Sequence, residues 1–289
     1  SEAMNATPTT VGVLHPGAMG VTVAAACAAS GAADVLWCSA GRSPESTDRA
    51  AAAGLNGVDT LAELVERSDV IVSVCPPDAA LDVAGAVATL GFPGVYVDAN
   101  AIAPETARTV GERFDRFVDG GIIGPPAVRP GITRLYLSGD DMTEVRDVAS
   151  LWDGSMLDVR PIDGGPGAAS AVKIAYATWT KVSSAMLLAV RALARAEGVE
   201  APLLDEWAIS QPGTAERSEA TARMTAFKAW RFDGEMAEIA AAFAANGLPS
   251  GFGEAARDIF GRMAGFKGVD DATLDEVLDA VTSEALPRT

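Results

Sequence analysis

The first half of the chain alternates short apolar runs with longer segments in which alanine and other helix formers dominate. The runs at 10–14, 34–38, 70–75, 95–98, 116–118 and 135–138 are bounded by turn-forming or polar residues, which is typical of buried strands. Stretches such as 21–30 lie between these runs and are expected to be helical. Alternating strands and helices predict an α/β fold with a largely parallel, doubly wound sheet.

The pattern changes after residue 163. A Gly-Gly-Pro-Gly segment at 164–167 precedes a long apolar stretch over 168–197, and later apolar positions such as Met236, Ile239, Ala240 and Phe243 recur at helical spacing. We therefore predict an N-terminal Rossmann domain over residues 1–163 and an all-helical domain over residues 164–289. The long helix carries more apolar surface than a small domain covers easily, so we expect a homodimer formed through the helical domain.

Charge and composition narrow the classes of function. The formal net charge of −17 repels phosphate backbones and anionic lipids, so we expect neither nucleic acid nor a membrane as a partner. No apolar run approaches the roughly 18 residues of a membrane span, and the first ten residues lack a signal-peptide pattern. A cytoplasmic location is the resulting expectation. An anionic ligand would need a local cationic or amide-lined pocket.

The cysteines and the single histidine argue against several kinds of site. Cys27, Cys38 and Cys75 are odd in number and widely spaced, which favours reduced thiols over disulfides or a metal centre. His15 is the only histidine, and it lies in a glycine-rich segment. A Ser-His-Asp hydrolase and a bound metal are therefore both unexpected.

That glycine-rich segment follows the first apolar run and reads VGVLHPGAMG over residues 11–20. A turn of this kind between a strand and a helix presents backbone amides to a pyrophosphate. Gly17 lets the backbone approach the phosphate, and Gly20 lets the helix pack close to the strand. His15 stands where the first glycine of the usual fingerprint lies, and because Pro16 follows it, we expect His15 to be extended.

The loop after the second apolar run favours a 2′-phosphate. An acidic residue that binds the ribose hydroxyls usually lies about 20 residues after the turn, but this chain has Ser39 there. Gly41, Arg42 and Ser43 follow, and a guanidinium beside hydroxyls and amides suits a phosphate. We predict NADP(H) as the cofactor.

Four motifs occur in one order along nearly the whole chain: Gly17-Ala18-Met19-Gly20, Val74-Cys75-Pro76-Pro77, Asp98-Ala99-Asn100 with Pro104, and Gly167 leading through a helix to Lys173. In these motifs the chain resembles the β-hydroxyacid dehydrogenase superfamily, which includes 3-hydroxyisobutyrate and 6-phosphogluconate dehydrogenases and the related imine reductases. The resemblance implies that the Cys75–Pro77 loop lies beside the nicotinamide ribose. It also implies that Asn100 lies near the nicotinamide and substrate, and that Lys173 is the catalytic acid or base.

The chain departs from the superfamily where the substrate is recognised. The segment that helps to hold a substrate carboxylate in relatives corresponds to 119–125 here, and Ile123 cannot donate a hydrogen bond from its side chain. Ala177 replaces an asparagine, and a Lys-Asp pair is replaced near Gly234 and Glu235. Because of these differences, the sequence does not identify the small-molecule substrate.

Lys173 also stands out without the resemblance, because it interrupts the apolar helical run 168–177. Reducing a carbonyl by hydride creates an alkoxide that needs a proton donor, and a desolvated lysine can serve. Tyr176 lies one turn further and could donate a hydrogen bond or simply pack. Imine reduction and a non-catalytic NADP(H)-binding module are the alternatives to carbonyl or β-hydroxy chemistry.

The predicted catalytic residues are therefore Lys173, Asn100 and Tyr176. The predicted cofactor-binding residues are His15, Pro16, Gly17, Ala18, Met19, Gly20, Ser39, Gly41, Arg42, Ser43, Cys75, Pro76, Pro77 and Asn100.

Overall fold

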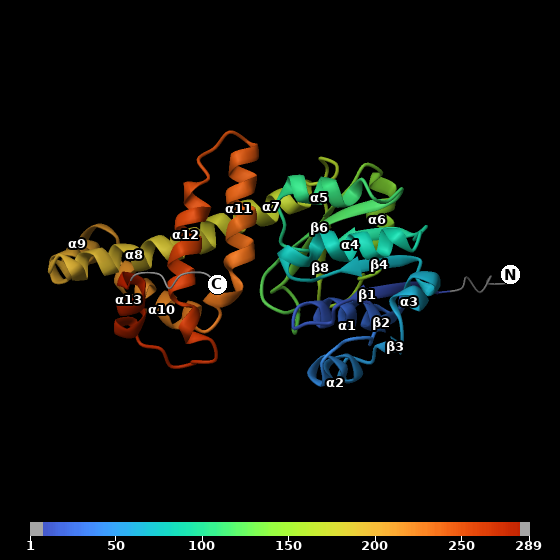
Figure 1. Cartoon of the computed structure of the whole chain (residues 1–289), viewed down its shortest axis with the longest axis horizontal. Helices are drawn as coiled ribbons and strands as arrows, with labels where there is room; N and C mark the ends of the chain where they lie inside the picture. Colours follow the sequence, from blue (N-terminus) through green and yellow to red (C-terminus); the bar gives the residue numbers. More distant parts are fainter. Residues whose placement is uncertain (1–7, 284–289) are drawn as a thin grey trace. The chain divides into compact units, whose positions relative to one another are not determined.

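A computed structural model describes residues 8–283 of the chain. By its contacts the chain divides into two compact units, the first ending at Ile174 and the second beginning at Ala175. The first unit is an α/β sheet and the second is helical (Figure 1). Most of the first ten residues, where no signal pattern was expected, lie outside the described part.

The first unit alternates strands and helices as the pattern predicted. Its elements are β1 (Thr9–Leu14), α1 (Gly20–Ser30), β2 (Ala33–Cys38), α2 (Pro44–Ala52), β3 (Asn56–Val58), α3 (Leu61–Arg67), β4 (Val70–Ser73), η1 (Pro77–Ala79), α4 (Ala80–Thr89), β5 (Val95–Asp98), α5 (Pro104–Gly111), β6 (Phe117–Ile123), β7 (Arg134–Ser138), α6 (Met142–Ser150), β8 (Asp158–Pro161) and most of α7 (Ala168–Ala177).

These strands form one sheet in the order β3-β2-β1-β4-β5-β6-β7-β8. The first six strands are parallel, β7 is antiparallel to β6, and β8 is parallel to β7. Helices α1 and α6 contribute to the core on one face, and α3, α4 and α5 to the core on the other (Figure 1). The predicted doubly wound sheet is confirmed. The strand order reverses between β1 and β4, which is where such sheets bind ligands.

Two strands lacked a clear signal, and a third is longer than expected. The strand β3 reads Asn-Gly-Val and β8 reads Asp-Val-Arg-Pro, so neither forms an apolar run. The prediction ended β6 at Val118, but the strand continues through Asp119, Gly120 and Gly121 to Ile123. Glycine is required at 120, because a Cβ there would lie 2.9 Å from the Asp98 carbonyl oxygen.

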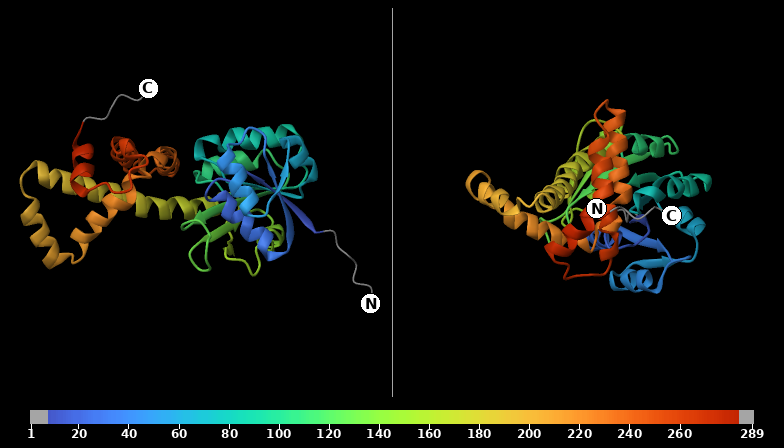
Figure 2. Two further views of the ribbon diagram at one scale, coloured as in Figure 1. Left: turned by 90° about the horizontal axis from the view of Figure 1, so that it is seen from below. Right: turned by 60° about the vertical axis from the view of Figure 1, so that its left-hand side comes forward.

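The second unit is helical throughout its described residues, which confirms the all-α prediction. Its elements are the end of α7, a π-helical turn η2 (Thr178–Val182), α8 (Ser183–Ala196), α9 (Glu200–Ser210), α10 (Thr214–Ala226), η3 (Ala229–Arg231), α11 (Asp233–Ala245), α12 (Gly251–Arg262), η4 (Ala264–Phe266) and α13 (Leu274–Thr282). In Figure 2, α9 leads away from the end of α8 and α10 returns toward it. No described helix is long and apolar enough to cross a membrane.

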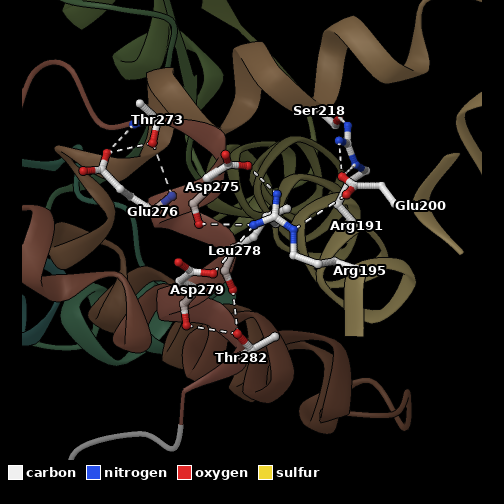
Figure 3. Close-up of polar contacts among 10 residues, drawn as sticks. All are labelled: Arg191, Arg195, Glu200, Ser218, Thr273, Asp275, Glu276, Leu278, Asp279 and Thr282. Carbon is white, nitrogen blue, oxygen red and sulfur yellow. Dashed lines mark hydrogen bonds and ion pairs between the residues drawn. The ribbon is translucent and has the colours of Figure 1, made fainter. Parts of the chain in front are cut away.

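A polar network joins four helices of this unit (Figure 3). Arg191 of α8 is 3% exposed and donates to Glu200 of α9 at 2.5 Å and to the Ser218 hydroxyl of α10 at 2.6 Å. One turn along α8, Arg195 pairs with Asp275 of α13. The network satisfies a buried charge that would otherwise destabilise the helical core.

Candidate cofactor and active site

The candidate site lies at the carboxyl ends of the parallel strands, beginning with the turn between β1 and α1. His15 directly follows β1 and has a φ of 61°, and no other non-glycine residue in 8–283 has a positive φ. The expectation of an extended His15 was therefore wrong. His15 adopts the left-handed conformation in which the usual first glycine is favoured, and the Gly17 amide donates to the His15 carbonyl at 2.7 Å.

The two glycines of the turn serve different purposes. A Cβ on Gly20 would lie 2.7 Å from the His15 carbonyl oxygen and 3.4 Å from the Val74 Cβ, so only glycine fits there without a shift. A Cβ on Gly17 would meet no neighbour closer than 4.0 Å, so the lack of a side chain there keeps the approach to the turn open. Gly20 thus serves packing, whereas Gly17 can serve a ligand.

The start of α1 suits the pyrophosphate of a dinucleotide. Helix α1 begins at Gly20, its N-cap Met19 makes no side-chain cap, and its first turn contains no acidic residue. The positive end of an 11-residue helix is therefore directed to an open turn without a competing carboxylate of its own. The residues present fit the predicted cofactor.

A pocket of about 330 Å³ adjoins this turn and lies within the first unit. Leu14, His15, Cys38 and Arg42 line it from the β1 and β2 ends, and Val83 and Val87 line it from α4. The His15 Nδ1 atom is buried without a hydrogen-bond partner among the described residues. Burial, with a smaller contribution from the Arg42 charge, lowers the pKa of His15 to about 4, so the imidazole is neutral at pH 7.

Among the four loop residues predicted to select the 2′-phosphate, only Arg42 lines the pocket. The Ser39 hydroxyl donates to the Val58 carbonyl at 3.1 Å and so holds β3. Gly41 supplies a positive φ of 68°, and the Ser43 hydroxyl accepts from the Ser46 amide as the N-cap of α2. These three residues shape the loop that presents Arg42.

Arg49 also stabilises the β1–α1 turn, a role that was not predicted from the sequence. Its Nε atom donates to the Pro16 carbonyl at 3.3 Å, which ties α2 to the β1–α1 turn. No signal in the sequence singles it out, because an arginine near the end of a polar helix is usually solvated. The pocket-lining Val83 and Val87 were also missed, although their i, i+4 spacing after the Cys-Pro-Pro loop indicates one helix face.

Asn100 braces the ends of β4 and β5. Its Oδ1 accepts from the Cys75 amide at 2.6 Å, and its Nδ2 donates to Asp98 at 2.9 Å and to the Ser73 hydroxyl at 3.2 Å. The residue is 2% exposed. These bonds occupy both amide donors, so Asn100 holds the loop at 75–77 in place by direct contact.

That loop turns from β4 into α4 through Pro76 and the 3₁₀ turn that begins at Pro77. The Cys75 thiol lies 3.8 Å from the Ser73 hydroxyl. Burial is the main cause that raises the pKa of Cys75 to about 11, so this cysteine is a protonated thiol at neutral pH and not a nucleophile.

Lys173 is positioned by a buried anchor at the start of α7. Asp119 of β6 accepts from the Ser170 amide at 2.9 Å and from the Ser170 hydroxyl at 2.6 Å, and burial raises the pKa of this carboxyl group. One helical turn later, Lys173 lies against β6 where Gly121 has no side chain. A Cβ on Gly121 would be 3.1 Å from the Lys173 Cβ and 2.5 Å from the Ala169 carbonyl oxygen.

Strand register brings Lys173 and Asn100 to the same sheet edge. Asp98, the last residue of β5, pairs with Asp119 of β6, and neighbouring strands are spaced about 4.8 Å apart. Asn100 follows β5 by two residues, and Gly121 lies two residues beyond Asp119, so both are at the same edge of the sheet. Lys173 is half-buried. Tyr176, one turn further along α7, is 48% exposed.

The structure also describes three positions at which the sequence departs from the pattern of the superfamily that it resembles. Ile123 at the end of β6 is 4% exposed and Ala177 is 2% exposed, so both are packing residues. Glu235, near which the Lys-Asp pair was expected to be replaced, forms an ion pair with Lys181.

Sequence comparisons match two parts of the chain. Residues 10–101 match a family described as NADP oxidoreductase, coenzyme F420-dependent, and residues 194–263 match a domain family of unknown function, DUF1932. An uncharacterized 28.5 kDa protein from Methanothermus fervidus is 29% identical over 174 residues. Those residues are 60% of this chain and 66% of that protein, so the chain matches just under two thirds of the relative's length.

Solved structures match over almost the whole chain. A 3-hydroxyisobutyrate dehydrogenase from Mycobacterium tuberculosis has a TM-score of 0.68 at 18% identity, covering 96% of this chain and 100% of the other. An imine reductase from Myxococcus stipitatus, solved with NAD⁺, has a TM-score of 0.54 at 17% identity, covering 96% and 100%. At these identities the similarity shows a shared fold.

Proposed function

We propose that this chain, which belongs by its fold to the β-hydroxyacid dehydrogenase superfamily, is an NADP(H)-dependent oxidoreductase acting on a small carbonyl or β-hydroxy compound. The observation that carries the proposal is the β1–α1 turn at the point where the strand order reverses. There an uncapped helix start and the open Gly17 lie beside a pocket lined by Arg42. The dinucleotide, when bound, supplies or accepts the hydride.

The preference for NADP(H) rests on Arg42. This side chain is exposed at the pocket edge, and the acid that usually binds the ribose hydroxyls is replaced by Ser39, whose hydroxyl is directed to β3. An arginine beside a phosphate forms charge-assisted bonds that a ribose hydroxyl cannot match. The neutral His15 adds no charge of its own to the pocket at pH 7.

Lys173 is the proposed proton donor in reduction and the proton acceptor in oxidation. The Asp119–Ser170 anchor fixes the start of its helix, and Gly121 allows the helix to lie against β6. An amine held in place at the sheet edge can give a proton to an alkoxide as the hydride arrives. Asn100 acts as a positioning residue for the Cys75 loop, and a catalytic role of Tyr176, which is 48% exposed, stays a prediction.

Cofactor binding tests the first half of the proposal. Isothermal titration of NADPH and NADH compares the wild type with Arg42→Ala and with the control Arg67→Ala, whose exposed side chain pairs with Glu63 on α3. Losing charge-assisted bonds should weaken NADPH binding about tenfold or more and leave NADH binding unchanged. Equal weakening of both cofactors would contradict the role of Arg42.

Turnover tests the second half. NADPH absorbance is followed with semialdehydes, ketoacids, ketones and cyclic imines for the wild type, Lys173→Ala and Lys173→Arg. Arginine keeps the charge but cannot release a proton near neutral pH, so both variants should lose carbonyl reduction while still binding NADPH. Imine turnover that survives in Lys173→Ala would identify an imine reductase. Tight NADPH binding without turnover on any class would favour a non-catalytic binding module.

A cytoplasmic homodimer, with the helical unit as its interface, is part of this proposal. Support comes from large apolar side chains that remain exposed on α8 and α9, among them Met186 at 55%, Leu193 at 63% and Ile209 at 79%. Analytical ultracentrifugation of the wild type and of Leu193→Glu measures whether this surface associates. A wild-type protein that sediments as a monomer at micromolar concentration would refute the dimer.

A further inference from the structure

The helical unit contains a second pocket that the proposed cofactor chemistry does not use. It has a volume of about 320 Å³ and is formed by the π-helical turn, α8, α10 and the segment around η3. This volume is at the small end of ligand-binding pockets. Phe232 and Phe260 form part of its lining, with ring centroids 5.0 Å apart in an edge-to-face arrangement.

Three cationic side chains line this pocket although the chain carries a net charge of −17. Lys181, on the π-helical turn, is already paired with Glu235 and lies 4.5 Å from the centre of the Phe232 ring. For Arg217 and Lys228, by contrast, no carboxylate of residues 8–283 lies within ion-pair distance. The pocket therefore keeps two uncompensated positive charges.

The protonated form of Lys228 is destabilised in this arrangement. It is half-buried, and burial together with the nearby charges of Lys181 and Arg231 lowers the pKa of Lys228. An acidic chain has 39 carboxylates with which such a lysine could pair. A half-buried cation that is close to another cation and has no described carboxylate within ion-pair distance is costly for folding alone, and such a cost is typical of ligand-binding positions.

Hydroxyl groups complete the lining. Thr180, Ser184, Thr221 and Thr225 face the same pocket. The Thr180 and Ser184 hydroxyls donate to backbone carbonyls of their own helix, which leaves their oxygen lone pairs as acceptors. The polar groups that can donate to a ligand are thus mainly the guanidinium and the ammonium, whereas Met224 and the two phenylalanines offer apolar contact.

From this arrangement we infer that the helical unit binds a small organic anion, with a carboxylate or phosphate group between Arg217 and Lys228 and an apolar part against Phe232. Carboxylate and phosphate share the chemistry that the two cations recognise. The inference does not depend on the proposed hydride transfer, because the pocket is built from residues of the second unit alone.

Methyl NMR of the full-length protein tests the inference. The Met224 methyl group, labelled with ¹³C, reports on the pocket during titration at constant ionic strength with inorganic phosphate, butyrate or the neutral butyramide. A saturable shift with phosphate or butyrate is expected, and the tighter of the two identifies the anionic group. Without nicotinamide cofactor in the sample, the result is independent of the proposed enzyme activity.

Matched variants separate recognition from general charge effects. Lys228→Gln and Arg217→Gln should each weaken the anion about tenfold or more, because each removes a charged hydrogen-bond donor. Arg223→Gln, also on α10 but exposed and outside the pocket lining, should bind as the wild type does. Lys228→Gln should also melt no lower than the wild type without ligand, which excludes misfolding as the cause.

Three results would overturn the inference. A butyramide shift equal to that of butyrate would show an apolar pocket without anion recognition. A linear response to all salts, or an equal loss in Arg223→Gln, would show non-specific screening of surface charge.

Discussion

The ion pair of Arg191 and Glu200 joins a buried partner to a partly exposed one, so truncating its two halves should have unequal effects. The Arg191 side chain is 4% exposed and that of Glu200 is 28% exposed. In Glu200→Ala, the guanidinium remains buried with the Ser218 hydroxyl as its partner among the described residues. Removing one partner of a buried pair costs about 3–5 kcal/mol, and we expect the free energy of unfolding to fall by that amount.

Arg191→Met should cost much less, about 1 kcal/mol or below, because it removes the buried charge together with its desolvation penalty. Glu200 then keeps its exposure to water and an arginine, Arg195, with an Nε atom 3.7 Å away. The Ser218 hydroxyl still donates to the Ala215 carbonyl at 2.6 Å. The double variant should therefore be more stable than Glu200→Ala alone, which gives a coupling energy of about 2 kcal/mol or more.

Urea unfolding followed by circular dichroism measures these differences, and hydrogen exchange over residues 183–226 assigns them to the helical unit. Arg195→Met is the control on the same helix. Two of its three acidic partners, Asp275 and Asp279, are 79% and 78% exposed, and such pairs contribute about 0–1 kcal/mol. The third, Glu200, keeps Arg191 as its partner in this variant. If Arg191→Met destabilises the protein as much as Glu200→Ala, and the double variant shows no rescue, the argument from asymmetric burial is refuted.

Three further predictions concern the first unit. Gly20→Ala should weaken NADPH binding and lower stability by about 1–3 kcal/mol, since its Cβ meets a backbone oxygen at 2.7 Å; unchanged titration and melting would contradict this. The pKa of His15 is about 4 in the folded protein against an ordinary 6.5, so between these pH values unfolding takes up a proton. The free energy of unfolding should therefore fall by about 1–2 kcal/mol from pH 6.5 to pH 4, after allowing for partial exposure. In urea titrations, His15→Asn should flatten that dependence on pH. Asp119→Asn should lower the free energy of unfolding by about 1.5–3 kcal/mol, because it disrupts the hydrogen bonds to Ser170. A melting temperature equal to that of the wild type would show that Asp119 does not anchor α7.

The architecture was predictable because buried parallel strands have a local signature. A strand covered by helices on both faces is apolar over most of its length, and β1, β2, β4 and β5 each contain such an apolar run. The edge strands β3 and β8 are short and largely polar or exposed, so their strand geometry comes from pairing with neighbours and leaves little trace in the sequence. The end of β6 was not predicted for a different reason. Gly120 and Gly121 are not typical strand residues, and they are required there by close contacts with segments distant in sequence.

The conformation of His15 shows where local rules fail. Pro16 disfavours a helical conformation at the preceding residue and led to the expectation of an extended histidine. The turn instead reverses direction immediately after β1, and the bond from the Gly17 amide to the His15 carbonyl fixes that reversal. The strain of a positive φ at a non-glycine residue is maintained by the surrounding structure. Only contacts distant in sequence, such as that of Arg49 with Pro16, could have indicated it.

The cationic pocket of the helical unit was beyond the reach of sequence reasoning for a related reason. Its three cations are separated by 36 and 11 positions along the chain and come from different helical segments. Each one alone is an ordinary surface charge of an amphipathic helix, and Lys181 is indeed neutralised by Glu235. Arg217 and Lys228 stand out because neither forms an ion pair with a described carboxylate, although the acidic chain offers many. Uncompensated charge that persists against such a background is more readily explained by a ligand than by folding.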